Sequence, residues 1–288
     1  MSARIFTAEE ELPFTGHPVI GAAAALHERH AAGDPARSWV FVIAGREITV
    51  RSRRTEGHYE AELTVHSDEL SPYALMTVGD GDLIKAVLLN AGVRRRGRGL
   101  RVLEWGAGLS TLSFSAILSE EGIPFHWLAL EYDRGFCESS IAPELLSRPG
   151  GTLRYVEDDR TVSGPPGTGT GKTEVVCWNR AALRPFLGEE HLADRSADLD
   201  AYVDYPGSAG SEFDVVLVDG RKRRRCLLTA LDLAGEHTAV LLHDSSRMYY
   251  HPAMREYPAS RFIGDDLWIG AASEATLAMA LASQDGRA

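Results

Sequence analysis

The strongest constraint on how this chain can fold is an alternation of short apolar runs with helical patterns, which begins near residue 80. The clearest run is Val215-Val216-Leu217-Val218, which is apolar at every position, as expected for a strand that is covered on both faces. A helical stripe follows it, formed by Leu227, Ala230, Leu231 and Ala234. Strands that alternate with helices predict a doubly wound α/β fold with a mostly parallel sheet.

Other segments extend this pattern along the chain. Apolar spacing from Leu83 to Leu88 predicts a helix, for which Asp80 or Asp82 is the candidate N-cap. Residues Thr111 to Leu118 have the pattern of a second helix. Further strands are predicted at residues 100–103, 125–130, 153–156 and 239–242, with closing strands at 262–263 and 267–269.

The first 76 residues lack this alternation, and we interpret them as an accessory segment that serves as a lid or as a contact in a homodimer. The β-type runs 39–43 and 48–51 flank a turn and predict a hairpin, with residues 59–65 as a candidate third strand. Residues 77–288 then form one domain. It carries an insertion at about 159–210, rich in Gly, Pro and acidic residues, which we expect to be partly helical around 180–187 with a mobile Gly-rich tip.

Charge and composition exclude several classes of protein. The 288 residues include 30 Lys and Arg against 41 Asp and Glu, a formal charge of −11, whereas general nucleic-acid binding needs a basic face. Two basic runs, 94–98 and 221–225, are interpreted as hydrated surface. Three widely spaced cysteines disfavour a disulfide framework or a structural zinc site. No run is apolar enough for a membrane helix and the first residues lack a secretory pattern, so we expect a cytoplasmic protein without a membrane partner.

A glycine-rich turn lies where the strand at 100–103 meets the following helix. It runs from Glu104 to Thr111 with the sequence EWGAGLST. Glycines let the backbone turn tightly and approach a ligand, and the helix N-terminus adds free N–H groups. Thr111 stands where a nicotinamide-binding fingerprint needs its third glycine, so that class of site is not predicted. Glu104 instead suits an ammonium group, such as the amino-acid end of a ligand whose polar remainder the loop amides would bind.

Carboxylates also follow the next two predicted strands. Glu131, beside Tyr132, ends the strand at 125–130 and could bind both hydroxyls of a ribose. Glu157 and Asp158 follow the strand at 153–156, where the edge of a nucleobase would fall. Ligands of open parallel sheets bind beyond the carboxyl ends of the strands. Three successive strand ends therefore offer partners for an ammonium group, a ribose and a base.

In order, these motifs resemble those of the class I S-adenosylmethionine-dependent methyltransferases. Residues 104–110 are similar to the first motif of that family, with Ser110 as a tolerated variant, and residues 130–133 resemble the second. Residues 213–221, FDVVLVDGR, and 240–247 resemble the fourth- and fifth-strand motifs of a bacterial small-molecule-type subgroup. The resemblance covers roughly residues 77–270. It implies a Rossmann-like fold, S-adenosyl-L-methionine as cofactor, and methyl transfer to an oxygen or nitrogen of a small-molecule acceptor in biosynthesis.

The resemblance also implies roles for individual residues. The glycine turn would cradle the methionine part, Glu131 would hold the ribose, Glu157 or Asp158 would face the adenine, and Asp219 would lie between cofactor and acceptor. The cofactor-binding set that it implies is Glu104, Gly106, Ala107, Gly108, Ser110, Thr111, Glu131, Tyr132, Glu157, Asp158 and Asp219.

Some members of this family bind a divalent metal through an Asp after the fourth strand and an acidic or amide pair after the fifth. Asp219 and Asp244 match those places, but Ser245 replaces the second residue of the pair. Divalent cations such as Mg²⁺ and Ca²⁺ need several oxygen ligands. Metal dependence therefore stays open, and no metal ligand is assigned.

The candidate catalytic residues are His243, Asp244 and Asp219. Histidine is the usual general base near neutral pH, and Asp244 could orient His243 at the end of its strand. The alternative is a strand-end histidine that is simply hydrogen-bonded to backbone. Arg221, with the arginines after it, could meet an anionic acceptor, because the guanidinium group suits carboxylate and phosphate.

Three other functions stay open. Residues 164–173 resemble a P-loop, which would suggest an ATPase, but the position of its first glycine is Pro166 and no apolar strand runs directly into it. A flexible loop is the preferred interpretation of that segment. The same fold could also serve as a non-catalytic cofactor-binding scaffold or sensor. An aminopropyl transferase that uses the decarboxylated cofactor is the remaining alternative.

Overall fold

The structure is a computed structural model that describes residues 5–6, 11–12, 16–43, 46–55, 58–63, 76–95, 97–165, 171–180, 196–208 and 212–282. The chain divides into two compact units, Met1–Leu70 and Ser71–Ala288. Among the described residues, no helix is both long and apolar enough to cross a bilayer.

The first unit contains a helix and a three-stranded antiparallel sheet, β3-β4-β5, together with a short strand pair. The predicted hairpin is present, with Trp39 opposite Val50, although its turn at 44–45 lies outside the described residues. Helix α1 was not predicted, and it packs on the sheet through a small core that includes Ala23 and Phe41. The elements are β1 (Ile5–Phe6), β2 (Glu11–Leu12), α1 (Gly16–His30), β3 (Ala36–Ile43), β4 (Arg46–Thr55) and β5 (His58–Leu63).

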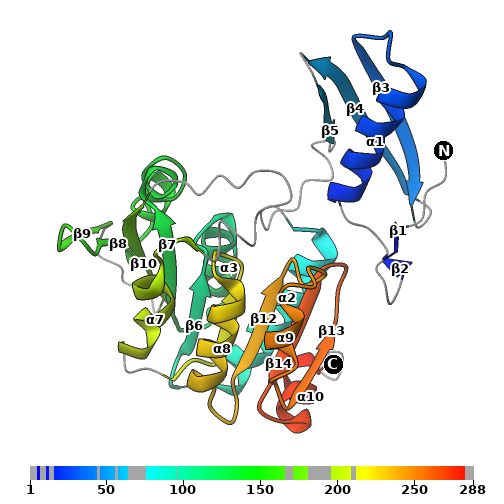
Figure 1. Cartoon of the computed structure of the whole chain (residues 1–288). Helices are drawn as coiled ribbons and strands as arrows, with labels where there is room; N and C mark the ends of the chain where they lie inside the picture. The colour runs from blue at the N-terminus through cyan, green and yellow to red at the C-terminus, as the bar shows by residue number, and fades with distance from the viewer. Residues whose placement is uncertain are drawn as a thin grey trace. The chain divides into compact units, whose positions relative to one another are not determined.

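The second unit is built on a nine-stranded sheet with the order β13-β14-β12-β11-β6-β7-β10-β8-β9 (Figure 1). The six strands from β12 to β8 are parallel, and β13, β14 and β9 pair antiparallel at the two edges. The strands are β6 (Leu100–Trp105), β7 (Phe125–Asp133), β8 (Gly151–Tyr155), β9 (Arg160–Ser163), β10 (Gly171–Arg180), β11 (Val215–Val218), β12 (Ala239–His243), β13 (Ala259–Phe262) and β14 (Leu267–Ala271).

Helices cover both faces of this sheet, because successive residues of the central strands point to opposite sides. Val102 of β6 joins one core with α2, α3 and α10, whereas Leu103 joins a second core with α7, α8 and α9. The predicted doubly wound α/β fold is therefore confirmed. The helical elements are α2 (Val78–Arg94), α3 (Leu109–Glu120), α4 (Arg134–Phe136), the π-helical η2 (Cys137–Ile141), α5 (Ala142–Leu145), α7 (Asp200–Ser208), α8 (Arg223–Leu233), α9 (His251–Met254) and α10 (Glu274–Leu281).

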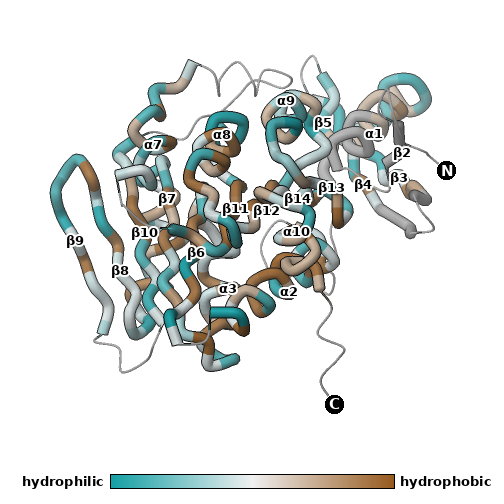
Figure 2. The backbone as a smooth tube through the Cα atoms, turned by 90° about the horizontal axis from the view of Figure 1, so that it is seen from below, coloured by the Kyte–Doolittle hydropathy of each residue, from teal (hydrophilic) through white to brown (hydrophobic). Residues whose placement is uncertain are grey.

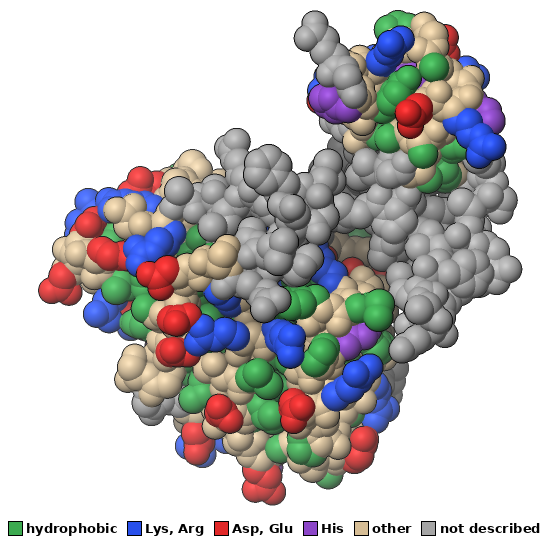
Figure 3. Space-filling model, in the orientation of Figure 1, with side chains coloured by type: hydrophobic (Ala, Val, Ile, Leu, Met, Phe, Trp, Pro, Cys, Tyr) green, Lys and Arg blue, Asp and Glu red, His purple; other side chains and the backbone are tan. Residues whose placement is uncertain are grey.

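The hydropathy of the backbone agrees with this layering. The hydrophobic stretches in Figure 2 gather in the sheet and on the helices against it. Acidic and basic side chains are interspersed on the face of the second unit that Figure 3 shows.

One prediction about the insertion is wrong. Residues 171–180 are not loop or helix but strand β10, which pairs in parallel with both β7 and β8. The helix expected from residue 180 conflicts with Arg180, the last residue of that strand, and residues 181–195 lie outside the described residues. The run Val175-Val176-Cys177-Trp178 is fully buried, as a central strand requires, but Gly- and Pro-rich sequence before it obscured the signal.

The N-cap prediction for α2 is also wrong. Thr77 caps the helix, and its side chain accepts a hydrogen bond from the amide of Asp80. The Asp80 carboxylate has no exposed surface and accepts hydrogen bonds from the amides of Asp265 and Asp266, at 2.8 and 3.2 Å. Asp80 thus ties α2 to the turn between β13 and β14.

Candidate ligand site at the carboxyl edge of the sheet

The glycine turn after β6 makes direct backbone contact with the chain that leaves β11. Gly106 has φ of 98°, a left-handed conformation that favours glycine. A Cβ atom at Gly106 would lie 2.5 Å from the backbone nitrogen and Cα of Gly220. Two strand ends therefore meet with only glycine between them, and this contact brings Asp219 next to the turn.

Most amides of this turn bond within the chain. The amides of Gly106 and Ala107 donate to the carbonyl oxygen of Leu130 at 2.9 and 3.0 Å, and that of Gly108 donates to the Thr111 hydroxyl at 3.0 Å. These three amides therefore already have acceptors within the chain. The first amides of α3 lack intrahelical acceptors by helix geometry, so they are the donors that this turn can offer.

Glu104 lies beneath the turn with no exposed surface. The hydroxyls of Ser110 and Thr111 each donate to its carboxylate at 2.6 Å, and the indole N–H of Trp127 donates at 2.8 Å. Burial raises the pKa of Glu104 to about 7 despite these three donors. Its contacts tie β6, α3 and β7 together, and an ammonium group would have to reach an oxygen that has no exposed surface.

Glu131 near the end of β7 is also buried, with 4% of its surface exposed. One carboxylate oxygen accepts hydrogen bonds from the amides of Tyr132 and Asp133, both at 2.8 Å. Burial raises its pKa to about 8, and the nearby Asp133 and Glu104 carboxylates add to that effect. The Tyr132 hydroxyl lies 3.5 Å from the Arg221 guanidinium. At neutral pH burial therefore favours the protonated form of Glu131.

Glu157 and Asp158 do not follow the strand next to β7, as the sequence had suggested, because β10 lies between β7 and β8. The Glu157 carboxylate accepts from the amide of Asn179 and the guanidinium of Arg180, both at 2.8 Å. Asp158 pairs with Arg134 at 2.8 Å. The strand end beside Glu131 is instead that of β10, where Cys177 lies opposite Glu131.

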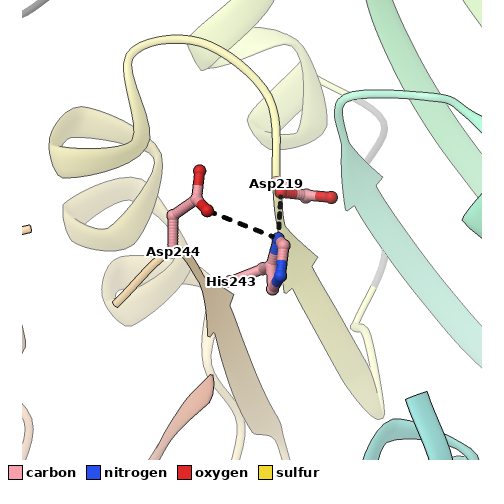
Figure 4. A group of neighbouring side chains, drawn as sticks. All are labelled: Asp219, His243 and Asp244. Carbon is pink, nitrogen blue, oxygen red and sulfur yellow. Dashed lines mark hydrogen bonds and ion pairs between the residues drawn. The ribbon is translucent and has the colours of Figure 1, made fainter. Parts of the chain in front are cut away.

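Asp219, His243 and Asp244 come together where β11 and β12 end. The Nδ1 atom of His243 lies 3.0 Å from Asp219 Oδ1 and 4.0 Å from Asp244 Oδ1. Figure 4 shows the His243 ring between the two carboxylates, with both contacts drawn as dashed lines. Burial lowers the pKa of His243, but the two carboxylates outweigh it and raise that pKa to about 9. At neutral pH the imidazole is therefore protonated and paired, which argues against the predicted role of a free general base.

Arg223, which the sequence interpretation assigned to hydrated surface, is buried at the same place. Its side chain is 11% exposed and pairs with Asp219 and Asp244, each at 3.1 Å. Burial opposes its charge, yet these carboxylates raise the pKa of Arg223 above its usual value. The sequence does contain an indication of this contact: Arg223 follows Asp219 by four residues, a spacing that favours an ion pair at the start of a helix.

A divalent cation at this place would have Asp219, His243 and Asp244 as its ligands, since one donor atom from each lies within 4.8 Å of the others. The donor set does not fit a metal, however, because Arg223 pairs with both carboxylates and Arg247 binds Asp244 at 2.8 Å. A dication about 4 Å from the Arg223 guanidinium would be repelled by roughly 8 kcal/mol at an effective dielectric constant of about 20. The carboxylate charge that would offset this repulsion is already matched by the two arginines.

Tyr202 of α7 is a second residue that the sequence did not single out. Its ring is fully buried, and its hydroxyl has no hydrogen-bond partner among the described residues. The hydroxyl lies against Gly220, at the crossing of the two strand ends. A buried hydroxyl without a partner is costly, so this position is one that a water molecule or a rearrangement on ligand binding would satisfy.

The P-loop alternative fails on position. Gly171 begins β10 opposite Phe125, the first residue of β7, so Lys172 lies at the amino edge of the sheet. The Lys172 ammonium lies 3.6 Å from the Glu174 carboxylate. A P-loop joins the carboxyl end of a strand to a helix, and this segment instead leads into a strand.

Comparisons with known proteins leave the function open. No protein-family model matches the chain, and no curated protein matches it. A predicted epimerase from Pseudomonas aeruginosa is 47% identical over 22% of each chain, with a TM-score of 0.21, so the chain spans about a fifth of its length. A methyltransferase-like protein from Silicibacter pomeroyi is 20% identical over 70% of this chain and 95% of that one (TM-score 0.41). Spermidine synthase from Thermotoga maritima is 12% identical over 82% and 73% (TM-score 0.35). These likenesses are too distant to carry an argument, and the fold stands on its own strand order.

Proposed function

We propose that the second unit is an S-adenosylmethionine-dependent methyltransferase that acts on a small anionic acceptor. The observation that carries the proposal is the meeting of three strand ends at one edge of the sheet. The glycine turn after β6 touches the chain beyond Asp219, and Glu131 lies on the neighbouring strand. Switch points of parallel sheets are where such folds bind nucleotide-like ligands.

In this proposal the chain contributes binding and alignment, and the bound cofactor supplies the activated methyl group. Glu131 accepts the ribose hydroxyls, and the first amides of α3 bind the polar end of the ligand. Asp219, fixed by His243 and Arg223, borders the space for the acceptor. Because His243 is already protonated, its imidazole cannot take a proton from the acceptor. The acceptor atom must therefore be nucleophilic without that help.

A pocket of about 510 Å³ beside the start of α8 supports an anionic acceptor. Arg225 in its wall pairs with Asp200, and the Arg224 guanidinium carbon lies 5.6 Å from the centre of the Tyr249 ring. A planar or apolar body could pack on that ring while its anionic group meets the basic side chains. The residues that set its charge are Lys222, Arg224 and Arg225 against Asp198 and Asp200.

The direct test is calorimetric titration of the full chain with S-adenosylmethionine and S-adenosylhomocysteine in a buffer that contains EDTA. Glu131→Ala should weaken binding about 10- to 100-fold, as expected when a charge-assisted hydrogen bond is lost. Glu274→Gln, on an exposed residue of α10 paired with Arg261, is the matched control. No measurable affinity in the wild type would remove the proposal.

The ionisation of Glu131 gives a second readout. Ribose hydroxyls donate to the carboxylate form, so affinity should rise as pH increases toward about 8, the folded-state pKa of Glu131. Glu131→Gln should flatten that dependence. Binding without turnover in an acceptor screen would favour a scaffold or sensor, and a preference for the decarboxylated cofactor would favour aminopropyl transfer.

A further inference from the structure

We infer that Arg223 occupies the place of a divalent cation between the ends of β11 and β12, so that this site works with a guanidinium as its fixed cation and binds no metal. The inference concerns the chain's own side chains and does not depend on which ligand the cleft accepts.

The contacts of the guanidinium carry the inference. Its Nε donates to the carbonyl oxygen of Gly220 at 2.9 Å, Nη1 donates to that of His243 at 2.5 Å, and Nη2 donates to that of Asp219 at 2.9 Å. Nη1 also lies 3.1 Å from Asp244 Oδ2, and Nη2 lies 3.1 Å from Asp219 Oδ1. All three nitrogens of Arg223 are therefore engaged, and the planar group joins both strand ends as a bound ion would.

The start of α8 aims the side chain at this place. Lys222 precedes the helix in a left-handed conformation, with φ of 57°, and makes no side-chain cap. Arg223, the first residue of the helix, then reaches back to carbonyl oxygens three and four residues earlier. Arg225 points elsewhere, toward Asp200 and Asp204 of α7. The two arginines thus form a matched pair, one inside the site and one outside it.

Space and charge both exclude a second cation. Arg223 is almost fully buried, so an incoming ion would have to displace the guanidinium rather than lie beside it. Asp244 has a further cationic partner in Arg247, at 2.8 Å. Removing the Arg223 side chain, in contrast, would leave Asp219, His243 and Asp244 with their donor atoms within 4.8 Å of one another and without that cation.

The experiment is a titration with Mn²⁺ of the full chain freed of metals by EDTA, followed by the electron paramagnetic resonance signal of free Mn²⁺. The wild type and Arg225→Ala should leave that signal unchanged. Arg223→Ala should bind one Mn²⁺ per chain and show a higher unfolding temperature with Mn²⁺ than with EDTA. Adding Asp244→Asn to Arg223→Ala should abolish the binding.

Two results would overturn the inference. The first is binding of one Mn²⁺ per chain by the wild type, with loss of that binding in Asp219→Asn. This comparison tests the inference even if Arg223→Ala does not fold. The second is a folded Arg223→Ala that binds no Mn²⁺. The methyltransferase proposal would be contradicted by a different result, the absence of S-adenosylmethionine binding. That result would not change the interpretation of the Mn²⁺ titration.

Discussion

Two parts of the same sheet edge hold acidic side chains in opposite electrical surroundings. At the ends of β6 and β7, Glu104 and Glu131 accept hydrogen bonds from neutral N–H and O–H groups, and burial raises their pKa values to about 7 and 8. At the ends of β11 and β12, Asp219 and Asp244 face the cation of Arg223, and the pKa of His243 is raised to about 9. Burial favours the neutral acid unless a cation lies beside it. The first pair is therefore held among neutral donors, with no cation beside it among the described residues, whereas the charge of the second pair is compensated by Arg223.

The sharpest way to break this contrast is to remove the cation. Arg223→Met takes the shared cation away from Asp219 and Asp244, which keep only their contacts with His243 and Arg247, and it removes the guanidinium donor from three carbonyl oxygens. It should therefore lower the free energy of unfolding by about 3 kcal/mol. Arg225→Met, whose ion pairs are exposed, should cost less than about 1 kcal/mol. Urea denaturation measures both, and equal losses would contradict the distinction between them.

The glycine turn offers the next largest effect. Gly106→Ala places a Cβ against the backbone of Gly220 at a φ of 98°, and should destabilise the protein by about 3 kcal/mol. Gly122 also has a positive φ, 65°, but has open space around it, so Gly122→Ala should cost only about 1 kcal/mol. Thermal unfolding of the two variants separates the close approach from backbone strain alone.

The charge on His243 predicts a pH dependence. Its folded-state pKa, about 9, is above the unfolded value of 6.5, so its contribution is fully present below about pH 6.5 and is lost as pH rises through 9. The advantage of the wild type over His243→Gln should therefore shrink by up to about 3 kcal/mol between about pH 6 and pH 10.

Denaturation curves at the two ends of that range measure the change, with His237→Gln, on an exposed residue before β12, as the control. A difference that stays constant with pH would show that His243 is not paired with Asp219 in solution.

The smallest effect is expected at Tyr202. Removing a buried hydroxyl that has no partner avoids its desolvation cost, so Tyr202→Phe should raise the free energy of unfolding by about 1 kcal/mol. If the variant is less stable than the wild type, the hydroxyl has a partner such as a bound water. Calorimetry in the presence and absence of S-adenosylhomocysteine would then show whether the ligand supplies that partner.

Much of the fold follows from local pattern. The strand at Val215–Val218 is apolar at every position, because it is buried on both faces. The helix that contains Leu227 has apolar residues along one stripe, because only one of its faces packs against the sheet. Strand β10 was missed because its apolar run, Val175 to Trp178, follows a segment rich in Gly and Pro, which is typical of a loop. Helix α1 was missed because its central alanines, 22–25, favour a helix but give no contrast between apolar and polar positions.

The candidate site divides in the same way. Gly106, Glu131, Asp219 and His243 could be named from the sequence, since residues that follow parallel strands meet at one edge. The charge states of the ionisable residues could not be predicted in this way, because a pKa depends on neighbours that lie far away in the chain. The run 221–225 shows the limit, since the structure buries Arg223 and leaves Arg225 exposed.

The alternation of strand and helix, the glycine turn and the acidic residues at the strand ends follow from the amino-acid sequence, because each depends on residues that are neighbours along the chain. Folding in three dimensions sets the position of β10 between β7 and β8, the inward direction of Glu104 and the bridge that Arg223 makes from Asp219 to Asp244. Those outcomes depend on pairings between distant segments, whose energies come from burial and charge in three dimensions.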